Sequence, residues 1–308
     1  MLGYIVRRLV LTIPILLGVS AVTFLIIKIT PGDAAELMLG ISPVVDPVAY
    51  YSLRESLGLD QPVATQYLIF LQRLSHGDLG RSFYTGKPVV VEVLDALPKT
   101  LALAAASMAF ALVIGIVLGI IAAKRQSTKT DSAIMTISLL AASVPNFWLG
   151  LMFILLFSFY LNLTPVAGSG TIQNIILPAL TLGTFVAGSI ARMTRASMVE
   201  VLRQDYIRAA RARGLADRVV IYGHALRNAM IPVVTVGGLY FGNLMAGSFF
   251  VEKIFAYPGI GRLAVDAISR RDFTVIQGVV LTTAVTFVLV NLLVDILYAY
   301  FNPRIQYE

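Results

Sequence analysis

The sequence predicts an all-α membrane protein with six transmembrane helices. Hydrophobic residues make up 57% of the 308-residue chain and charged residues only 13%, whereas soluble domains are about half apolar and about a quarter charged. The apolar residues are gathered in runs close to the roughly 20 residues that a helix needs to cross a bilayer. Composition and run length together therefore decide the fold class.

Six runs are expected to span the membrane. They lie at about Leu9–Ile29, Pro98–Ala123, Ala133–Tyr160, Ile175–Ala191, Ala229–Val251 and Val275–Phe301. The first follows Arg7 and Arg8 as a secretory signal would, but it is longer than the apolar part of a signal and no small-x-small cleavage pattern ends it. We interpret it as an uncleaved first helix.

Proline and glycine positions predict how these helices bend and pack. Pro145 in the third run predicts a kink. Gly115 with Gly119, and Gly238 with Gly242, each place two small residues one turn apart. This spacing is typical of transmembrane helices that pack closely against a neighbour.

Lysine and arginine positions predict that both termini are cytoplasmic. With six spans and the N-terminus inside, the inside segments hold fourteen of these residues and the longer outside segments hold nine. The predicted organisation is a first helix (residues 1–30), an extracytoplasmic segment (31–97), a transmembrane core (98–301) with a cytoplasmic loop (192–228), and a cytoplasmic tail (302–308).

The residue types exclude most catalytic and metal chemistry. The chain has no cysteine, and its two histidines, His76 and His224, fall on opposite membrane faces in the predicted topology. No phosphate-binding loop is found, since a proline follows Gly86-Lys87 where the motif requires Ser or Thr. We expect no enzyme activity, no cofactor site and no metal site, and we attribute the basic charge to membrane topology rather than to nucleic-acid binding.

The strongest local charge bias lies between Arg192 and Asn228, a stretch that we call the basic segment. It holds eight arginines against three acidic residues. Charge alone suits either a helix that binds anionic lipid headgroups or a docking site for another protein.

Turn-forming residues predict two short helices inside the basic segment. Asp205 is expected to cap a helix from Tyr206 to Arg213, and Gly214 to end it in the left-handed conformation. Asp217 is expected to start a second helix that runs to about Leu226.

A motif in the basic segment favours protein docking. Arg208-Ala209-Ala210, three further residues and Gly214 are followed, after a spacer, by His224-Ala225-Leu226-Arg227-Asn228 and Pro232. This pattern resembles the cytoplasmic loop of the permeases of binding-protein-dependent ABC importers, written Glu-Ala-Ala, three residues and Gly. Arg208 stands where the family has glutamate and Arg227 where the loop has proline, as in the branch that transports peptides, glutathione and nickel.

The resemblance to that branch runs nearly end to end. Further matching segments are Met1–Arg8, Pro31–Asp33, Leu57–Pro62, Gly77–Gly80, Phe255–Gly261, Arg271–Asp272, Asn291–Asp295 and Asn302–Arg304. The resemblance implies the type I ABC importer permease fold, with the core from about the second span onward.

The resemblance also implies a role for the loop. Its helix would sit in a cleft of an ATP-hydrolysing subunit and pass motion to the membrane helices, using small residues for close approach and arginines for an acidic rim. The residues implied are Asp205, Arg208, Ala209, Ala210, Arg211, Arg213, Gly214, His224, Leu226, Asn228 and Pro232.

The implied partners follow from the same family. ATP and Mg²⁺ would bind two separate ATPase subunits, and a second, homologous permease would complete the path in the bacterial inner membrane. An extracytoplasmic binding protein would deliver a short peptide or glutathione, with a nickel chelate as the alternative within the branch.

A secondary transporter is the alternative from another class. Such proteins place several ionisable groups at mid-membrane, whereas this chain offers Lys28 near the end of the first span and Asp295 in the last. We expect Lys28 to snorkel to the surface. Asp295 is a candidate functional carboxylate, but the family that the chain resembles carries an aspartate there across different substrates, which favours a structural role. The path lining is not identified, because the polar candidates Ser143, Asn146 and Asn243 suit interhelical hydrogen bonds equally well.

Overall fold

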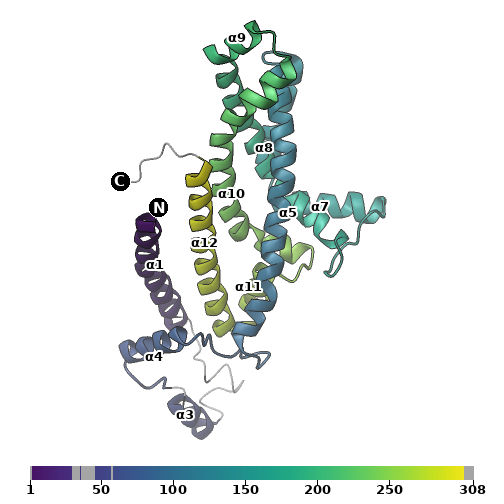
Figure 1. The fold of residues 1–308 in the computed structure, drawn as a ribbon. Coiled ribbons are helices and arrows are strands. Elements are labelled where there is room, and N and C mark those ends of the chain that lie inside the picture. Colours follow the sequence, from purple (N-terminus) through teal and green to yellow (C-terminus); the bar gives the residue numbers. More distant parts are fainter. Residues whose placement is uncertain (1, 30–34, 36–45, 57, 302–308) are drawn as a thin grey trace. The chain divides into compact units, whose positions relative to one another are not determined.

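The computed structural model describes residues 2–29, 35, 46–56 and 58–301. The regular secondary structure of this part of the chain is helical, apart from an isolated antiparallel bridge between Arg81 and Pro88, so the all-α prediction is confirmed (Figure 1). The predicted tail at 302–308, the Pro31–Asp33 motif and the side chain of Asp295 lie outside what the structure describes.

The chain forms a series of long helices joined by shorter helical elements. They are α1 (Leu2–Ile29), α3 (Pro47–Ser56), α4 (Val63–Ser75), α5 (Val89–Lys124), α6 (Lys129–Ser143), α7 (Asn146–Phe153) with the π-helix η1 (Ile154–Tyr160), α8 (Gln173–Leu202), α9 (Asp205–Ala212), the π-helix η2 (Val219–Ala225), α10 (Leu226–Ile254), α11 (Ile260–Arg270) and α12 (Phe273–Phe301). They form two compact units, one of residues up to Leu97 with Leu263–Thr286, and one of Pro98–Arg262 with the residues from Phe287 onward.

The structure supports up to six membrane crossings. Among the residues that the structure describes, five helices are long and apolar enough to cross, and α6 with α7 and η1 makes a sixth if the bent pair counts as one span. The pair bends by 103° where Val144 is extended and Pro145 precedes α7. Proline disfavours helix at the preceding residue and lacks an N–H to donate, so the predicted kink is in fact a break.

Helix α5 begins before the predicted span. It starts at Val89, so Pro98 lies inside the helix instead of at its beginning. Glu92 and Asp95 make the first turns less apolar than a span, but charged side chains do not interrupt the backbone hydrogen bonds of a helix.

Helix α8 continues past its predicted end at Ala191 and includes Arg192 and Arg195. Both guanidinium groups find partners on α6. Arg195 donates to the Asp131 carboxylate in two bonds of 2.5 and 2.6 Å, and Arg192 donates to the Ser138 carbonyl at 2.8 Å. Hydropathy falls after Ala191, but the helix continues, because Arg192 and Arg195 both find polar partners on α6.

In the first unit, polar contacts join segments far apart in sequence. Tyr67 on α4 lies 2.8 Å from the Ser20 hydroxyl on α1, and its ring packs beside Phe24 with centroids 5.4 Å apart. Ser82 donates to the buried Asp272 carboxylate between α11 and α12. These contacts fix α4 on α1 and the 80–88 turn on the start of α12.

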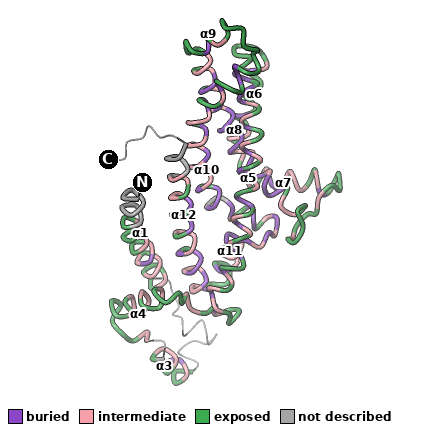
Figure 2. Tube along the Cα trace, in the orientation of Figure 1, coloured by how far each residue is buried: buried purple, intermediate pink, exposed green. Residues whose placement is uncertain are grey.

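In the second unit, α8 is the central helix (Figure 2). In its most apolar window 67% of the residues are buried. Helix α5 approaches it through Gly115 and Gly119: an added Cβ would lie 2.7 Å from the Ile190 side chain in the first case and 2.5 Å from that of Thr194 in the second. Only glycine permits so close a contact, so the packing prediction is confirmed.

The second glycine pair serves the same purpose on α10. A Cβ on Gly238 would collide with Val294, and one on Gly242 would lie 3.0 Å from the Phe287 ring, both on α12. These contacts lie within the second unit. Both predicted small-residue faces are therefore helix packing surfaces.

A buried carboxylate fixes the turn that follows α10. Glu252 is 0% exposed and accepts hydrogen bonds from the Thr100 hydroxyl at 2.7 Å and the Arg262 N–H at 3.1 Å. The Thr100 oxygen in turn accepts from the Ile260 N–H at 2.8 Å. Gly259 is required beside them, because an added Cβ would collide with the Glu252 carboxyl group.

We expect Glu252→Leu to destabilise the protein, because it leaves buried donors without an acceptor, at about 1–3 kcal/mol each. Thermal unfolding in detergent should show a Tm lower by roughly 5–10 °C. Glu252→Gln keeps an acceptor oxygen and should lose less than half as much. Equal Tm values for the wild type and the leucine variant would show that this carboxylate does not hold the turn.

Candidate functional site: the basic segment

The basic segment comprises the end of α8, then α9, η2 and the start of α10 (Figure 1). Helix α9 begins one residue earlier than predicted. Gln204, in the extended conformation, is the N-cap and makes no side-chain capping bond. Asp205 is the first helical residue, so the prediction that it caps the helix is wrong. Its carboxylate instead pairs with Arg208 at 3.3 Å, an exposed pair that contributes little to stability.

The end of α9 follows the prediction. Gly214 has a φ of +76°, the left-handed conformation that glycine adopts without strain. Its N–H donates to the Arg211 carbonyl at 2.9 Å, and Arg211 also pairs with Asp217 across the turn at 3.3 Å.

The second helix starts at Asp217 as predicted but does not end at Leu226. It runs through η2 into α10 without interruption. Each further residue adds a backbone hydrogen bond once a helix has formed, and no glycine or proline follows Ala225 before Pro232. The basic segment is therefore continuous with the fifth predicted span.

Ile207 anchors α9 to the rest of the second unit. It is the buried residue of this helix and is 0% exposed. The other buried members of its apolar cluster come from α5, α8, η2 and α10, and they are Ile120, Ala123, Met198, Val220, Ile221, Ala225 and Ala229. One side chain thus ties α9 to several long helices.

A polar contact strengthens the attachment. The Asn228 side-chain amide donates to the Tyr206 hydroxyl at 2.7 Å and lies 3.3 Å from the His224 carbonyl. Tyr206 precedes Ile207 on α9, so the start of α9 is held to the start of α10 by both polar and apolar contacts.

The small residues of the predicted motif face different ways. Ala209 is exposed, whereas Ala210 is partly buried against the Ile207 cluster. Gly214 has open space around it, since an added Cβ would meet nothing within 4 Å. Ala209 and Gly214 can therefore approach a second protein, while Ala210 serves the packing of this chain.

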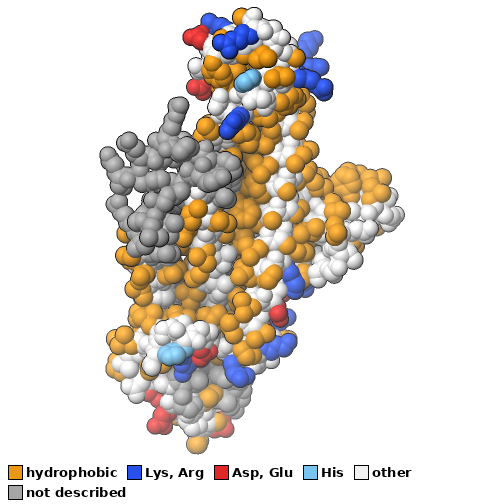
Figure 3. Space-filling model, in the orientation of Figure 1, with side chains coloured by type: hydrophobic (Ala, Val, Ile, Leu, Met, Phe, Trp, Pro, Cys, Tyr) orange, Lys and Arg blue, Asp and Glu red, His pale blue; other side chains and the backbone are white. Residues whose placement is uncertain are grey.

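The arginines of the motif are turned outward. Arg208, Arg211 and Arg213 are all exposed, and Figure 3 shows basic side chains gathered around the end of the molecule that carries α9. A hollow of about 260 Å³ beside them is lined by Lys124, Arg203, Arg211 and Asp217, among others. This surface presents positive charge to any partner.

The remaining predicted residues lie along η2 and α10. His224 and Pro232 are exposed, and Leu226 is partly buried against the Ile207 cluster. The structure thus brings Asn228 and Leu226 to α9. It leaves Pro232 outside that cluster, further along α10.

Two known protein families match the sequence along almost its whole length. Residues 115–307 match the family described as "Binding-protein-dependent transport system inner membrane component", and residues 1–104 match its N-terminal companion, "Binding-prot-dependent transport system membrane comp, N-term". The chain belongs to this permease family.

The sequence is similar to those of curated relatives along its full length. It is 44% identical to the "Di/tripeptide transport system permease protein DppB" of Pseudomonas aeruginosa, over 100% of both chains. It is also 44% identical to the "Glutathione transport system permease protein GsiC" of Escherichia coli, again over 100% of both chains. The expected location in the inner membrane and the expected transport role without enzyme activity are confirmed.

Solved structures support the fold. The MetNI methionine ABC transporter, described as inward-facing, matches with a TM-score of 0.59 and 19% identity, over 68% of the permease and 96% of that chain. A chain of an amino acid ABC transporter matches with a TM-score of 0.51 and 16% identity, over 70% and 94% respectively. The predicted type I importer fold is confirmed at the level of architecture.

Ile207 and Tyr206, which hold α9 in place, were not among the site residues predicted from the sequence. Their anchoring role could have been predicted, because they are the two large apolar or aromatic residues in a helix otherwise made of charged residues and alanine. Glu252 was also missed, although a lone carboxylate directly after an apolar run is an unusual feature.

We expect Ile207→Ala to loosen α9, because large-to-small changes in a packed core cost about 2–5 kcal/mol. Tryptic cleavage after Arg208 or Arg211 in membrane vesicles should accelerate by at least about tenfold, which corresponds to 1.4 kcal/mol. Leu215→Ala is the matched control, since Leu215 is 41% exposed on the same loop. Equal cleavage of the two variants would contradict the anchoring role of Ile207.

Proposed function

We propose that the permease is a subunit of an ATP-driven importer for short peptides, including glutathione. The observation that carries this proposal is full-length identity of 44% to permeases named for di/tripeptide and glutathione transport. A nickel chelate is less favoured, because these relatives are named for peptides.

The proposed assembly contains a second, homologous permease, two ATPase subunits and an extracytoplasmic binding protein. Its energy must come from other subunits, since the sequence has no phosphate-binding loop. Up to six spans are few for a complete path, which supports a second permease. The lysine and arginine distribution supports cytoplasmic termini and a cytoplasmic basic segment.

Helix α9 is the proposed site of coupling to the ATPases. Arg208, Arg211 and Arg213 point outward and suit an acidic rim on a partner. Inward, Ile207 packs against residues from α5, α8 and α10. Because packed interiors transmit displacement with little compression, movement of α9 would move these helices together and drive alternating access.

Co-purification with mass spectrometry, followed by uptake assays, tests this function. Two ATPase chains and a second permease should accompany the tagged chain, and vesicles should accumulate labelled dialanine or glutathione only with ATP. A lone chain that transports on an ion gradient would contradict the proposal and favour a secondary transporter. ATP-dependent uptake of nickel chelates without peptides would retain the importer and change its substrate.

We expect Ala209→Trp to abolish substrate-stimulated ATP hydrolysis, because the exposed alanine leaves room for a partner that tryptophan fills. Membrane insertion should be unchanged. Val166→Trp is the control, as Val166 is 52% exposed on the same unit but belongs to the connection between η1 and α8 and not to the basic segment. Ala210 is the poorer test position, because it is partly buried in this chain. Normal stimulation in Ala209→Trp would refute the coupling role of this face.

A further inference from the structure

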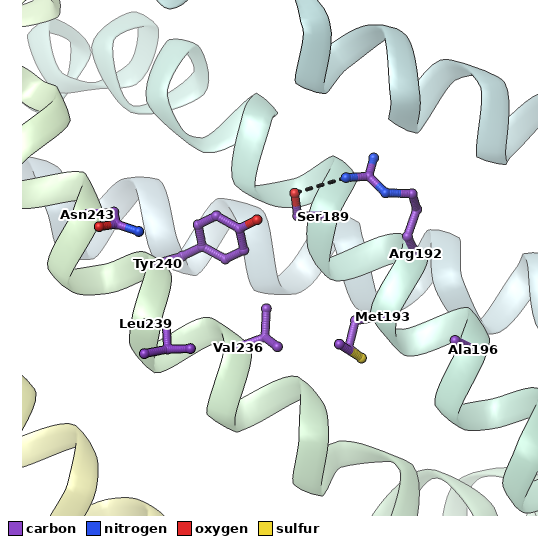
Figure 4. A pocket seen from close by; sticks show the side chains of 8 residues that line it. All are labelled: Ser189, Arg192, Met193, Ala196, Val236, Leu239, Tyr240 and Asn243. Carbon is purple, nitrogen blue, oxygen red and sulfur yellow. Dashed lines mark hydrogen bonds between the residues drawn. The ribbon is translucent and has the colours of Figure 1, made fainter.

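A hollow of about 600 Å³ lies between α8 and α10 within the second unit. Small-ligand sites typically measure about 300–1,000 Å³. Figure 4 shows the side chains that line it, which are Ser189, Arg192, Met193 and Ala196 on α8 and Val236, Leu239, Tyr240 and Asn243 on α10. It is mixed in character, with one cation, three neutral polar groups and an apolar floor.

The Arg192 side chain, which is the cation of this hollow, has hydrogen-bond donors that are not used within the described chain. Arg192 donates to the Ser138 carbonyl at 2.8 Å and to the Ser189 hydroxyl at 3.2 Å. A guanidinium carries five N–H donors, so several are unused. Arg195 has a carboxylate partner, Asp131, whereas within the described residues no acidic group pairs with Arg192.

Arg192 is the first residue of the basic segment and directly follows the apolar part of α8. It lies ten residues before the end of α8 at Leu202, which is about 15 Å along a helix, and inside the candidate span. A charged group at the end of an apolar stretch faces water or protein, because burying it in lipid is expensive. The hollow therefore faces an aqueous path or a partner and not the bilayer.

Two polar groups of α10 share this surface with Arg192. The Tyr240 hydroxyl and the Asn243 amide make no hydrogen bond within the described chain. The Tyr240 ring is held edge-on against Phe185 with centroids 5.8 Å apart, and in Figure 4 it extends toward Ser189. Both groups are placed to bind a polar ligand that enters the hollow.

We propose that Arg192 binds the terminal carboxylate of the substrate on its way across the membrane. The guanidinium fork matches a carboxylate in two parallel hydrogen bonds. Tyr240 and Asn243 then bind amide groups of the ligand, and Leu239 and Met193 contact its side chains. This inference rests on the proposed function, because peptides and glutathione carry such a carboxylate.

Thiol labelling in the hollow tests the inference without the binding protein. The chain has no cysteine, so Ala196→Cys gives it a single thiol at an exposed lining position. In the assembled transporter in lipid nanodiscs, millimolar dialanine should slow maleimide labelling at least about threefold, as expected at a concentration twice the Kd. Dialanine amide, which lacks the carboxylate, should not protect the thiol.

Substitutions assign the protection to Arg192. Adding Arg192→Gln should abolish it, and Arg192→Lys should keep part of it, since the charge remains but the fork is lost. Lys129→Gln is the charge-matched control and should keep full protection, because Lys129 is exposed at the start of α6 and does not line the hollow.

Several outcomes would overturn the inference. These are equal protection by the acid and the amide, protection that survives Arg192→Gln, and a thiol that never reacts because a partner fills the hollow. The first and third need no change at Arg192, so misfolding of that variant does not protect the inference. Peptide uptake without thiol protection would reject this site and keep the proposed function, whereas protection without uptake would keep the site and reject the peptide importer.

Discussion

The close approach of α5, α6 and α10 to α8 is the constraint on which the second unit depends. Lipid offers no hydrophobic force to hold helices together, so close packing and interhelical polar contacts must do so. Glycines supply the close packing: Gly115 and Gly119 bring α5 to α8, and Gly188 lets the Ser138 carbonyl of α6 approach to 2.5 Å from where a Cβ would stand. The α9 anchor and the hollow at Arg192 are both built on the frame that results.

The same helix connects the two proposed sites. Met198 on α8 belongs to the apolar cluster that buries Ile207 of α9, and Arg192 lies less than two turns earlier, at the hollow beside α10. A displacement of α9 would reach the hollow through a continuous helix and its packed neighbours. This arrangement would give a short mechanical route from the proposed docking surface on α9 to the hollow at Arg192.

Polar side chains in this protein mainly set the shape of connections. The Asp131–Arg195 pair joins α6 to α8, Glu252 organises the turn after α10, and Asp272 holds Ser82 in the first unit. A buried carboxylate with satisfied hydrogen bonds is costly to remove. Arg192 differs from these groups, because some of its N–H donors remain unused at an open hollow. For this reason we assign it a binding role and not a structural one.

The sequence by itself determined the helical class, the approximate spans, a bend at Pro145, the close packing at Gly115 and Gly119, and the stop at Gly214. Each depends on local composition or on one residue's backbone preference. Tertiary structure alone decided the length of α8 beyond Ala191, the anchoring of α9 by Ile207, the partners of Glu252 and the hollow at Arg192. These features depend on contacts between residues far apart in the chain, and no local pattern records which side chains will meet.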